Sequence, residues 1–202
     1  MNQYRSIKTD QLAGYAGISY EKKKIPAELG VWLFIIGDML VFTALFVSYA
    51  MQRSDQVTLF THSQTMLNQS FGVINTLLLL TGSLFVVLAL HSARNGYKRA
   101  LTRFLLLAIS TGLLFFIVKI FEYSEKISQG YNLLSNDFFM YYFMLTGIHL
   151  LHVCVAIGVL IFLLCRYHHG DNDIRNLESG GVIWHMVDLL WIVLFPLIYL
   201  IK

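Results

Sequence analysis

Residues 138–165 read FFMYYFMLTGIHLLHVCVAIGVLIFLLC, an apolar run without Asp, Glu, Lys or Arg. A transmembrane helix needs about 20 mainly apolar residues, so this run can cross a bilayer and also tilt or extend into water. Hydrophobic residues make up 56% of the 202 residues and charged residues 13%, whereas a soluble domain carries about 25% charge. The mean hydropathy is +0.62. This composition excludes a disordered chain and a nucleic-acid-binding tail protein, so no nucleic acid partner is expected.

Four further stretches are long and apolar enough to span a membrane, and none shows the alternating pattern of a membrane barrel strand. The sequence therefore predicts an all-α, polytopic membrane protein with a bundle of five transmembrane helices in residues 28–202. Residues 1–27 are predicted to form a polar tail, and residues 52–70 a polar loop. The predicted spans are residues 29–51, 71–90, 104–120, 138–165 and 182–201.

Basic residues are distributed unevenly between the two sides of these spans. Lys and Arg gather in the tail and in the segments before the third and fifth spans, whereas the opposite side has Arg53, Lys126 and Lys202. Cytoplasmic loops of membrane proteins carry the excess of Lys and Arg. We therefore expect the N-terminus and its tail inside, in the cytoplasm, and the C-terminus outside. The two ends of the bundle are called inner and outer on this basis.

Ionisable groups within spans are costly and usually face a protein interior or a water-filled cavity. Asp38 lies near the middle of the first span, as either a proton-exchanging carboxylate or the partner of a His or Lys on another helix. Asn75, near the outer face of the second span, is expected to hydrogen-bond to another helix. His91 closes the same span near the inner face, as either an interfacial anchor or a ligand.

The third span ends in a cluster of charges. Lys119 and Glu122 are three residues apart, and Glu122 and Lys126 are four apart, so each pair shares a helix face. Glu125 and Lys126 are expected in a solvated patch of ion pairs at the outer interface. The deeper Glu122 fits either that patch or a functional role.

Histidines mark the fourth and fifth spans. His149 and His152 share a helix face and could bind a metal or haem with ligands from other helices. Alternatively, they form a hydrogen-bonded pair buried against a neighbouring span. Residues 184–191 read WHMVDLLW, in which His185 and Asp188 share a face and either relay a proton or form a buried polar clasp. Trp184, Asp188 and Trp191 fall on one stripe, and Pro196 is expected to bend the outer half of the span.

The order and spacing of these residues resemble subunit III of the haem–copper terminal oxidases, in its five-helix bacterial form. The resemblance runs from about Glu28 to Lys202. Longer members have two further N-terminal helices that hold lipid, and an outer Trp-Pro-Pro, which this sequence lacks. Many members have Glu where this sequence has Asp38. The matching motifs are Gly37-Asp38, Asn75-Thr76 with Gly82, His91, Glu122-Tyr123, residues 146–153 (TGIHLLHV) and residues 184–191 (WHMVDLLW).

Two stretches are similar to the subunit-III-like protein associated with nitric oxide reductase: Gly37-Asp38-Met39 and residues 75–81 (NTLLLLT). The resemblance as a whole implies an accessory, non-catalytic subunit of a bacterial inner membrane, without haem, copper or another cofactor. Its implied partners are membrane lipids and catalytic subunit I of a haem–copper oxidase or nitric oxide reductase. It would stabilise that subunit and support its proton uptake in respiratory electron transport.

By the same resemblance, the polar residues of the spans form a polar interior or a lipid-facing surface instead of a redox centre. These residues are Asp38, Asn75, His91, Glu122, His149, His152, Trp184, His185 and Asp188. The residues alone leave two alternatives open. One is a small haem-binding membrane cytochrome that uses His149 or His152 with His91 or His185. The other is an independent proton or ion pathway through the bundle.

Overall fold

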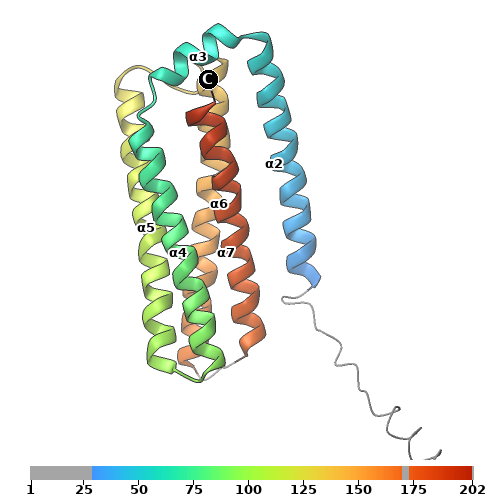
Figure 1. The fold of residues 1–202 in the computed structure, drawn as a ribbon, viewed down its shortest axis with the longest axis vertical. Helices are drawn as coiled ribbons and strands as arrows, with labels where there is room; N and C mark the ends of the chain where they lie inside the picture. The colour runs from blue at the N-terminus through green and yellow to red at the C-terminus, as the bar shows by residue number, and fades with distance from the viewer. Residues whose placement is uncertain (1–28, 170–172, 202) are drawn as a thin grey trace, which may run out of the picture.

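The computed structural model describes residues 29–169 and 173–201, and these form helices and no strand (Figure 1). Five of the helices are long and apolar enough to cross a membrane. The prediction of an all-α, multi-pass membrane protein with five spans is thus confirmed, whereas the predicted tail of residues 1–27 lies outside the described residues. The helices are α2 (Leu29–Asp55), α3 (Val57–Thr65), α4 (Gln69–Arg94), α5 (Lys98–Ser128), α6 (Asp137–His168), α7 (Ile174–Phe195) and the π-helix η1 (Pro196–Leu200).

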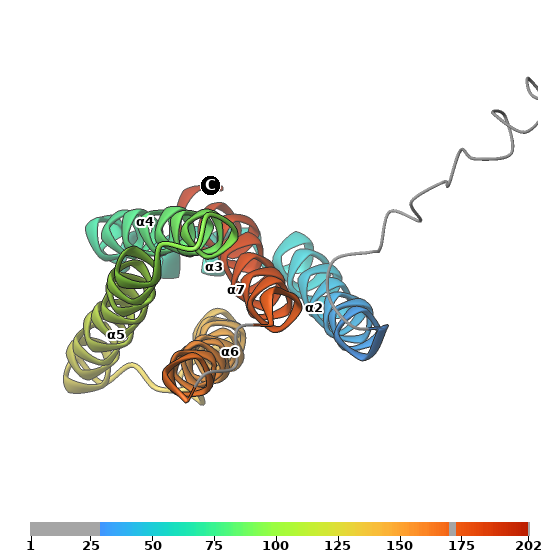
Figure 2. The ribbon, with the colours of Figure 1, turned by 90° about the horizontal axis from the view of Figure 1, so that it is seen from below.

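The helices α4, α5, α6 and α7 form the centre of the bundle, and α2 stands beside it (Figure 1, Figure 2). Of the 18 most apolar consecutive residues in α2, 11% are buried. The corresponding share in the last span, which consists of α7 and η1, is 50%. The short helix α3 lies across the outer end (Figure 1). The four central helices therefore supply most of the core, and α2 is a peripheral helix packed against α6 and α7.

Glycines end two of the central helices. Gly96 and Gly130 have φ angles of 74° and 89°, in the left-handed region that favours glycine. At the end of α4, the Tyr97 amide donates to the Ser92 carbonyl at 2.9 Å and the Gly96 amide to the Ala93 carbonyl at 3.1 Å. This is the Schellman arrangement, which satisfies carbonyls that the helix end would leave free. At the opposite ends, three helices begin with side-chain caps from Asn68, Asn136 and Asp173.

Other glycines allow the central helices to approach closely. A Cβ atom added at Gly82 would lie 2.5 Å from Thr111 Oγ1 and 2.8 Å from Trp184. One added at Gly112 would lie 2.9 Å from Ile157. Small residues at helix contacts are the usual means of close packing in membranes, where helix association depends on van der Waals contact.

The segment 52–70, predicted as a polar loop, is largely helical, which corrects that expectation. It contains the end of α2, the whole of α3 and the start of α4. Phe60 of α3 is 1% exposed, and its ring packs edge to face against Tyr49 and Phe138. A nine-residue helix is marginal by itself, so contact with the outer end of the bundle holds it in place.

Pro196 marks the change from α7 to the π-helix η1, and the bend expected there stays a prediction. A proline has no amide N–H and so leaves a carbonyl of the preceding turn without its helical donor. Neighbouring side chains bind the carbonyls of η1 from outside. The donors are Gln64 Nε2 to Ile198 O at 2.7 Å, Gln69 Nε2 to Tyr199 O at 3.0 Å and Tyr49 OH to Leu197 O at 3.3 Å.

Candidate functional site

A fully buried ion pair lies in the outer half of the central bundle. Lys119 Nζ is 2.9 Å from Glu122 Oε2, both on α5, and both side chains are 0% exposed. Tyr142 OH of α6 donates to Glu122 Oε1 at 2.8 Å, and Tyr199 OH of η1 donates to the same atom at 2.5 Å. Lys119 Nζ also donates to Tyr199 OH at 2.8 Å. The carboxylate therefore accepts from one ammonium and two phenols, which offsets the cost of burying its charge.

Aromatic rings surround the ammonium of this pair. Lys119 Nζ lies 5.1–5.4 Å from four ring centroids, within the range of cation–π attraction. The rings come from α5, α6, α7 and η1, so the ion pair ties together three of the central helices and the π-helix. They belong to Tyr123, Tyr142, Trp191 and Tyr199.

The prediction that Lys119 and Glu122 share a helix face is confirmed. The prediction that Lys126 lies in a solvated patch of ion pairs is wrong. Its side chain is 3% exposed and lies 3.3 Å from Glu125 Oε1, while the Glu125 side chain is 39% exposed. Lys126 Nζ donates to the Met66 carbonyl at 2.8 Å and does not pair with Glu122. The fold of the α3–α4 turn places this carbonyl above the end of α5, which the spacing of charges along α5 could not reveal.

Asp38 pairs with a histidine on another helix, as one of its two predicted roles requires. Asp38 Oδ1 of α2 lies 2.8 Å from His152 Nε2 of α6. The other ring nitrogen, His152 Nδ1, lies 2.7 Å from the Ile148 carbonyl, which can only accept, so Nδ1 carries a proton. The other carboxylate oxygen, Asp38 Oδ2, is buried without a hydrogen-bond partner among the described residues.

Further polar contacts join α2 to α6, and together with the Asp38–His152 pair they form what we call the α2 seam. Ser48 Oγ lies 2.7 Å from Tyr141 OH. Gln52 of α2 and Gln56, the residue between α2 and α3, both donate to Asp137 Oδ2, at 2.9 Å and 2.7 Å. Phe42 and Tyr49 of α2, both 1% exposed, add aromatic contacts to His152 and Tyr141 along the same seam.

His149 faces away from this seam, although it lies three residues before His152. Its ring centroid is 5.6 Å from that of Phe115 and 5.2 Å from that of Trp191. Neither His149 nitrogen has a hydrogen-bond partner among the described residues. The expected hydrogen-bonded histidine pair is therefore wrong, because His152 turns toward α2 and His149 toward α5 and α7. Two histidines that face different helices do not form the start of one metal or haem site.

Asn75 is completely buried in α4, and neither of its side-chain polar atoms has a partner within residues 29–169 and 173–201. The expected hydrogen bond from Asn75 to another helix is thus not present. Its neighbour Thr76 makes that contact, because Trp191 Nε1 donates to Thr76 Oγ1 at 2.9 Å.

The expected pairing of His185 and Asp188 is met in part: no direct hydrogen bond joins these two described side chains, but they interact electrostatically and both lie beside Ser83 of α4. His185 Nδ1 lies 2.6 Å from Ser83 Oγ of α4, and Asp188 Oδ1 is buried without a hydrogen bond to any described residue. The predicted stripe is confirmed, because Trp184, Asp188 and Trp191 are all buried. Trp184 Nε1 also has no partner in the described part of the chain.

His91 is exposed at the inner end of α4, with Nε2 3.0 Å from Asn95 Nδ2. This is the place of an interfacial anchor. Within the described ranges, no group of three or more His, Cys, Asp and Glu side chains is placed to hold a metal ion. The buried pair of α5 depends on Tyr142 and Tyr199, which sequence reasoning did not single out. Each is one aromatic residue within an apolar run, so only the fold brings them to Glu122.

The five apolar helices and the buried polar contacts between them define an all-helical, multi-pass membrane protein. The family model of cytochrome c oxidase subunit III matches residues 3–202. The chain therefore belongs to the cytochrome c oxidase subunit III family, and the resemblance inferred from its motifs is confirmed.

Several curated relatives are similar over most of this chain. Heme-copper oxidase subunit I+III of Aeropyrum pernix is 27% identical over 208 residues, which cover 98% of this chain and 25% of that protein. This chain thus spans a quarter of that relative. Cytochrome bo(3) ubiquinol oxidase subunit 3 of Buchnera aphidicola subsp. Acyrthosiphon pisum is 29% identical, covering 89% of this chain and 87% of the relative. Cytochrome c oxidase subunit 3 of Bacillus sp. strain PS3 is 25% identical, covering 85% and 84%.

Proposed function

We propose that this chain is the accessory subunit III of a bacterial haem–copper oxidase, without a cofactor of its own, and that it binds catalytic subunit I. The observation that carries this proposal is the family match over residues 3–202. A relative whose name joins subunits I and III in one chain supports the choice of partner, because a fusion keeps its parts in one assembly.

The arrangement of the polar interior supports an accessory role. Glu122 and Lys119 neutralise each other inside the core, and Asp38 is paired with His152. Such contacts hold helices together and specify how they pack. His152 contacts Asp38, His185 contacts Ser83 and His91 contacts Asn95, so three of the four histidines of the cytochrome alternative already bond to protein side chains.

We also propose that the α2 seam supports proton uptake by the partner enzyme. Asp38 lies nine residues after the start of α2, about 13 Å from the inner end. Its carboxylate contacts His152 through Oδ1, its side chain is 10% exposed, and Oδ2 is left without a hydrogen-bond partner among the described residues. In the assembled complex, Asp38→Asn should shorten the turnover lifetime and slow proton uptake. Asp55→Asn, at the exposed outer end of the same helix, is the matched control.

The association is tested by crosslinking intact native membranes before the tagged chain is purified in mild detergent. Recovery of a haem-containing oxidase subunit I, with no haem on this chain after separation, supports the proposal. Recovery of a nitric oxide reductase subunit replaces the oxidase as the partner. Haem retained by the isolated 23.2 kDa chain overturns the cofactor-free role. Because crosslinks form before solubilisation, a chain recovered alone contradicts the association.

A further inference from the structure

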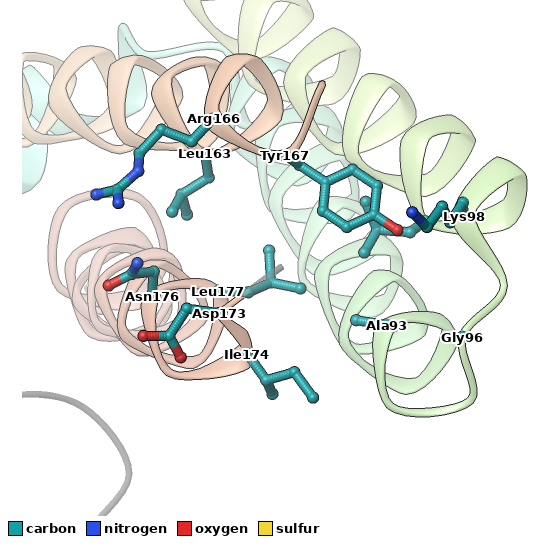
Figure 3. A pocket seen from close by; sticks show the side chains of 11 residues that line it. Ala93, Gly96, Lys98, Leu163, Arg166, Tyr167, Asp173, Ile174, Asn176 and Leu177 are labelled. Atoms are coloured by element: carbon teal, nitrogen blue, oxygen red, sulfur yellow. The ribbon is translucent and has the colours of Figure 1, made fainter. Parts of the chain in front are cut away.

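A cavity lies at the inner end of the bundle, where the four central helices diverge. It has a volume of about 220 Å³ and is bounded by the end of α4, the start of α5, the end of α6 and the start of α7 (Figure 3). It is far from the Lys119–Glu122 pair, which lies in the outer half. It also includes no residue of the α2 seam.

The interior of this cavity is apolar. Leucines from three helices line it, with Leu101 of α5 completely buried, Leu163 of α6 buried and Leu177 of α7 partly buried. Ala93 of α4 and Ile174 of α7 complete the apolar wall. Such a lining favours hydrocarbon over a polar metabolite.

The border of the cavity is polar and mainly basic. Lys98, on one side, is exposed, and the hydroxyl of Tyr167 points toward it in Figure 3. Arg166 stands on the other side. The acidic residue of the lining, Asp173, already caps α7 through the Arg175 amide at 3.0 Å and lies 3.7 Å from Arg175 Nε. Of the three charged residues that line the cavity, two are basic, so the border presents mainly positive charge to a ligand.

Size and position restrict the ligand further. Pockets that enclose a whole small molecule usually measure roughly 300–1,000 Å³, so 220 Å³ is room for only part of one. The cavity lies at the ends of four helices that are long and apolar enough to cross a membrane, and the ends of such helices reach the boundary between hydrocarbon and headgroups. Basic pockets between transmembrane helices on the cytoplasmic side are typical binding places for anionic lipids.

We propose that this inner-end cavity binds one anionic phospholipid. Part of an acyl chain lies against the leucines of α5, α6 and α7, and the phosphate lies against the ammonium of Lys98 and the hydroxyl of Tyr167. Binding fills the gap between α4–α5 and α6–α7, so the lipid stabilises the packing of the two helix pairs at this end. The site belongs to the central bundle and stands independently of the partner enzyme.

Charge at the border is tested on the full chain, purified in mild detergent, with phosphatidylglycerol and phosphatidylcholine of identical acyl chains. Salt at about 1 M shortens the screening length to about 3 Å, so that contact is measured and not diffuse attraction. Lys98→Gln should weaken phosphatidylglycerol binding about tenfold, as the loss of one charge-assisted hydrogen bond implies. Arg103→Gln is the matched control, because it removes one charge from the groove beside the cavity. It should change binding less than about twofold.

The acyl chain is tested by filling the cavity. Ala93→Phe places a ring inside it, whereas Ala100→Phe places the same ring in the neighbouring groove. Only Ala93→Phe should abolish phosphatidylglycerol binding.

Inorganic phosphate should not compete with phosphatidylglycerol, because it has no acyl chain to bury. Equal effects of Lys98→Gln and Arg103→Gln, equal binding of the two lipids, or competition by phosphate would each overturn the proposal. Melting temperatures measured without lipid show whether each variant is folded. If Ala93→Phe fails to fold, the comparison of Lys98→Gln with Arg103→Gln still decides, because replacing the exposed Lys98 side chain leaves the core intact.

Discussion

Tyr199 of η1 donates a hydrogen bond to Glu122 of α5 at 2.5 Å, although 77 positions separate the two residues in the chain. The π-helix is thereby coupled to the buried charge of the core. Gln64 and Gln69 donate hydrogen bonds to backbone carbonyls of η1, and the Tyr199 side chain anchors η1 to the buried Lys119–Glu122 pair. Any change that loosens η1 should therefore also disturb the ion pair.

Removal of the Tyr199 hydroxyl should be costly. Tyr199→Phe leaves Glu122 without one donor and Lys119 without one acceptor, which should lower the free energy of unfolding by about 1.5–3 kcal/mol. Unfolding in mixed detergent micelles measures it. Tyr131→Phe is the control, because its ring stacks on Phe139 and the described structure shows no hydrogen bond from its hydroxyl. Equal losses in the two variants would contradict a special role for Tyr199.

The ion pair should show strong coupling between its partners. Lys119→Met or Glu122→Gln alone leaves a polar or charged group without its partner and should destabilise the protein by about 3–5 kcal/mol. The double variant removes both groups, so its loss should be clearly smaller than the sum of the two single losses. A double-mutant cycle measured by unfolding tests this. Simple additivity would mean that the pair does not act as a unit.

Replacement by alanine should have different effects at Gly82, which is tightly packed, and at Gly158, which is not. Gly82→Ala forces its Cβ against Thr111 and Trp184, which should destabilise the bundle by about 1–3 kcal/mol. Gly158 has no atom within 4 Å of such a Cβ. Gly158→Ala should therefore be neutral or stabilise α6 by up to about 1 kcal/mol, because alanine is the better helix former. Thermal unfolding of both variants provides the comparison, and a greater loss at Gly158 would be inconsistent with this packing.

His149 and His152 of α6 should respond differently to replacement by leucine. His152→Leu breaks the α2 seam and leaves Asp38 unpaired, so hydrogen exchange along α2 should become faster. Interhelical hydrogen bonds in membranes contribute about 0.6 kcal/mol on average and up to about 1.7 kcal/mol. His149→Leu removes a buried ring whose nitrogens have no described partner, so stability should be unchanged or higher. Faster exchange of α2 in His149→Leu would show that the histidines do act together.

The number of spans was predictable because each apolar run exceeds the length that a bilayer requires. The helix ends were not, because α5 runs from Lys98 to Ser128 whereas the apolar window covers only residues 104–120. A helix can extend through charged and polar residues beyond its apolar part, because its backbone hydrogen bonds do not depend on hydropathy. Hydropathy alone therefore does not predict where such a helix ends. Gly96 and Gly130 are stop signals that the sequence contains, and they mark the ends of α4 and α5 more closely than hydropathy does.

Pairings between helices were only partly predictable. Asp38 needed a partner, and the sequence offered His or Lys without saying which. Spacing within one helix identified the Lys119–Glu122 face and the shared face of His185 and Asp188, but it could not reveal that Ser83 of α4 lies beside both of the latter. Helix periodicity shows which residues share a face, while the neighbour that each side chain meets depends on how the helices cross.

The spacing of Lys119 and Glu122 also has a consequence for biogenesis. A lysine at the centre of an isolated helix raises the free energy of membrane insertion by about 2.5–3.5 kcal/mol. Here the counter-charge stands three positions later on the same helix, so α5 contains both members of the pair when it leaves the ribosome. The residues that complete the site from α6 and η1 are neutral phenols. The translocon can therefore release α5 with its charge balanced before the remaining helices have been synthesised.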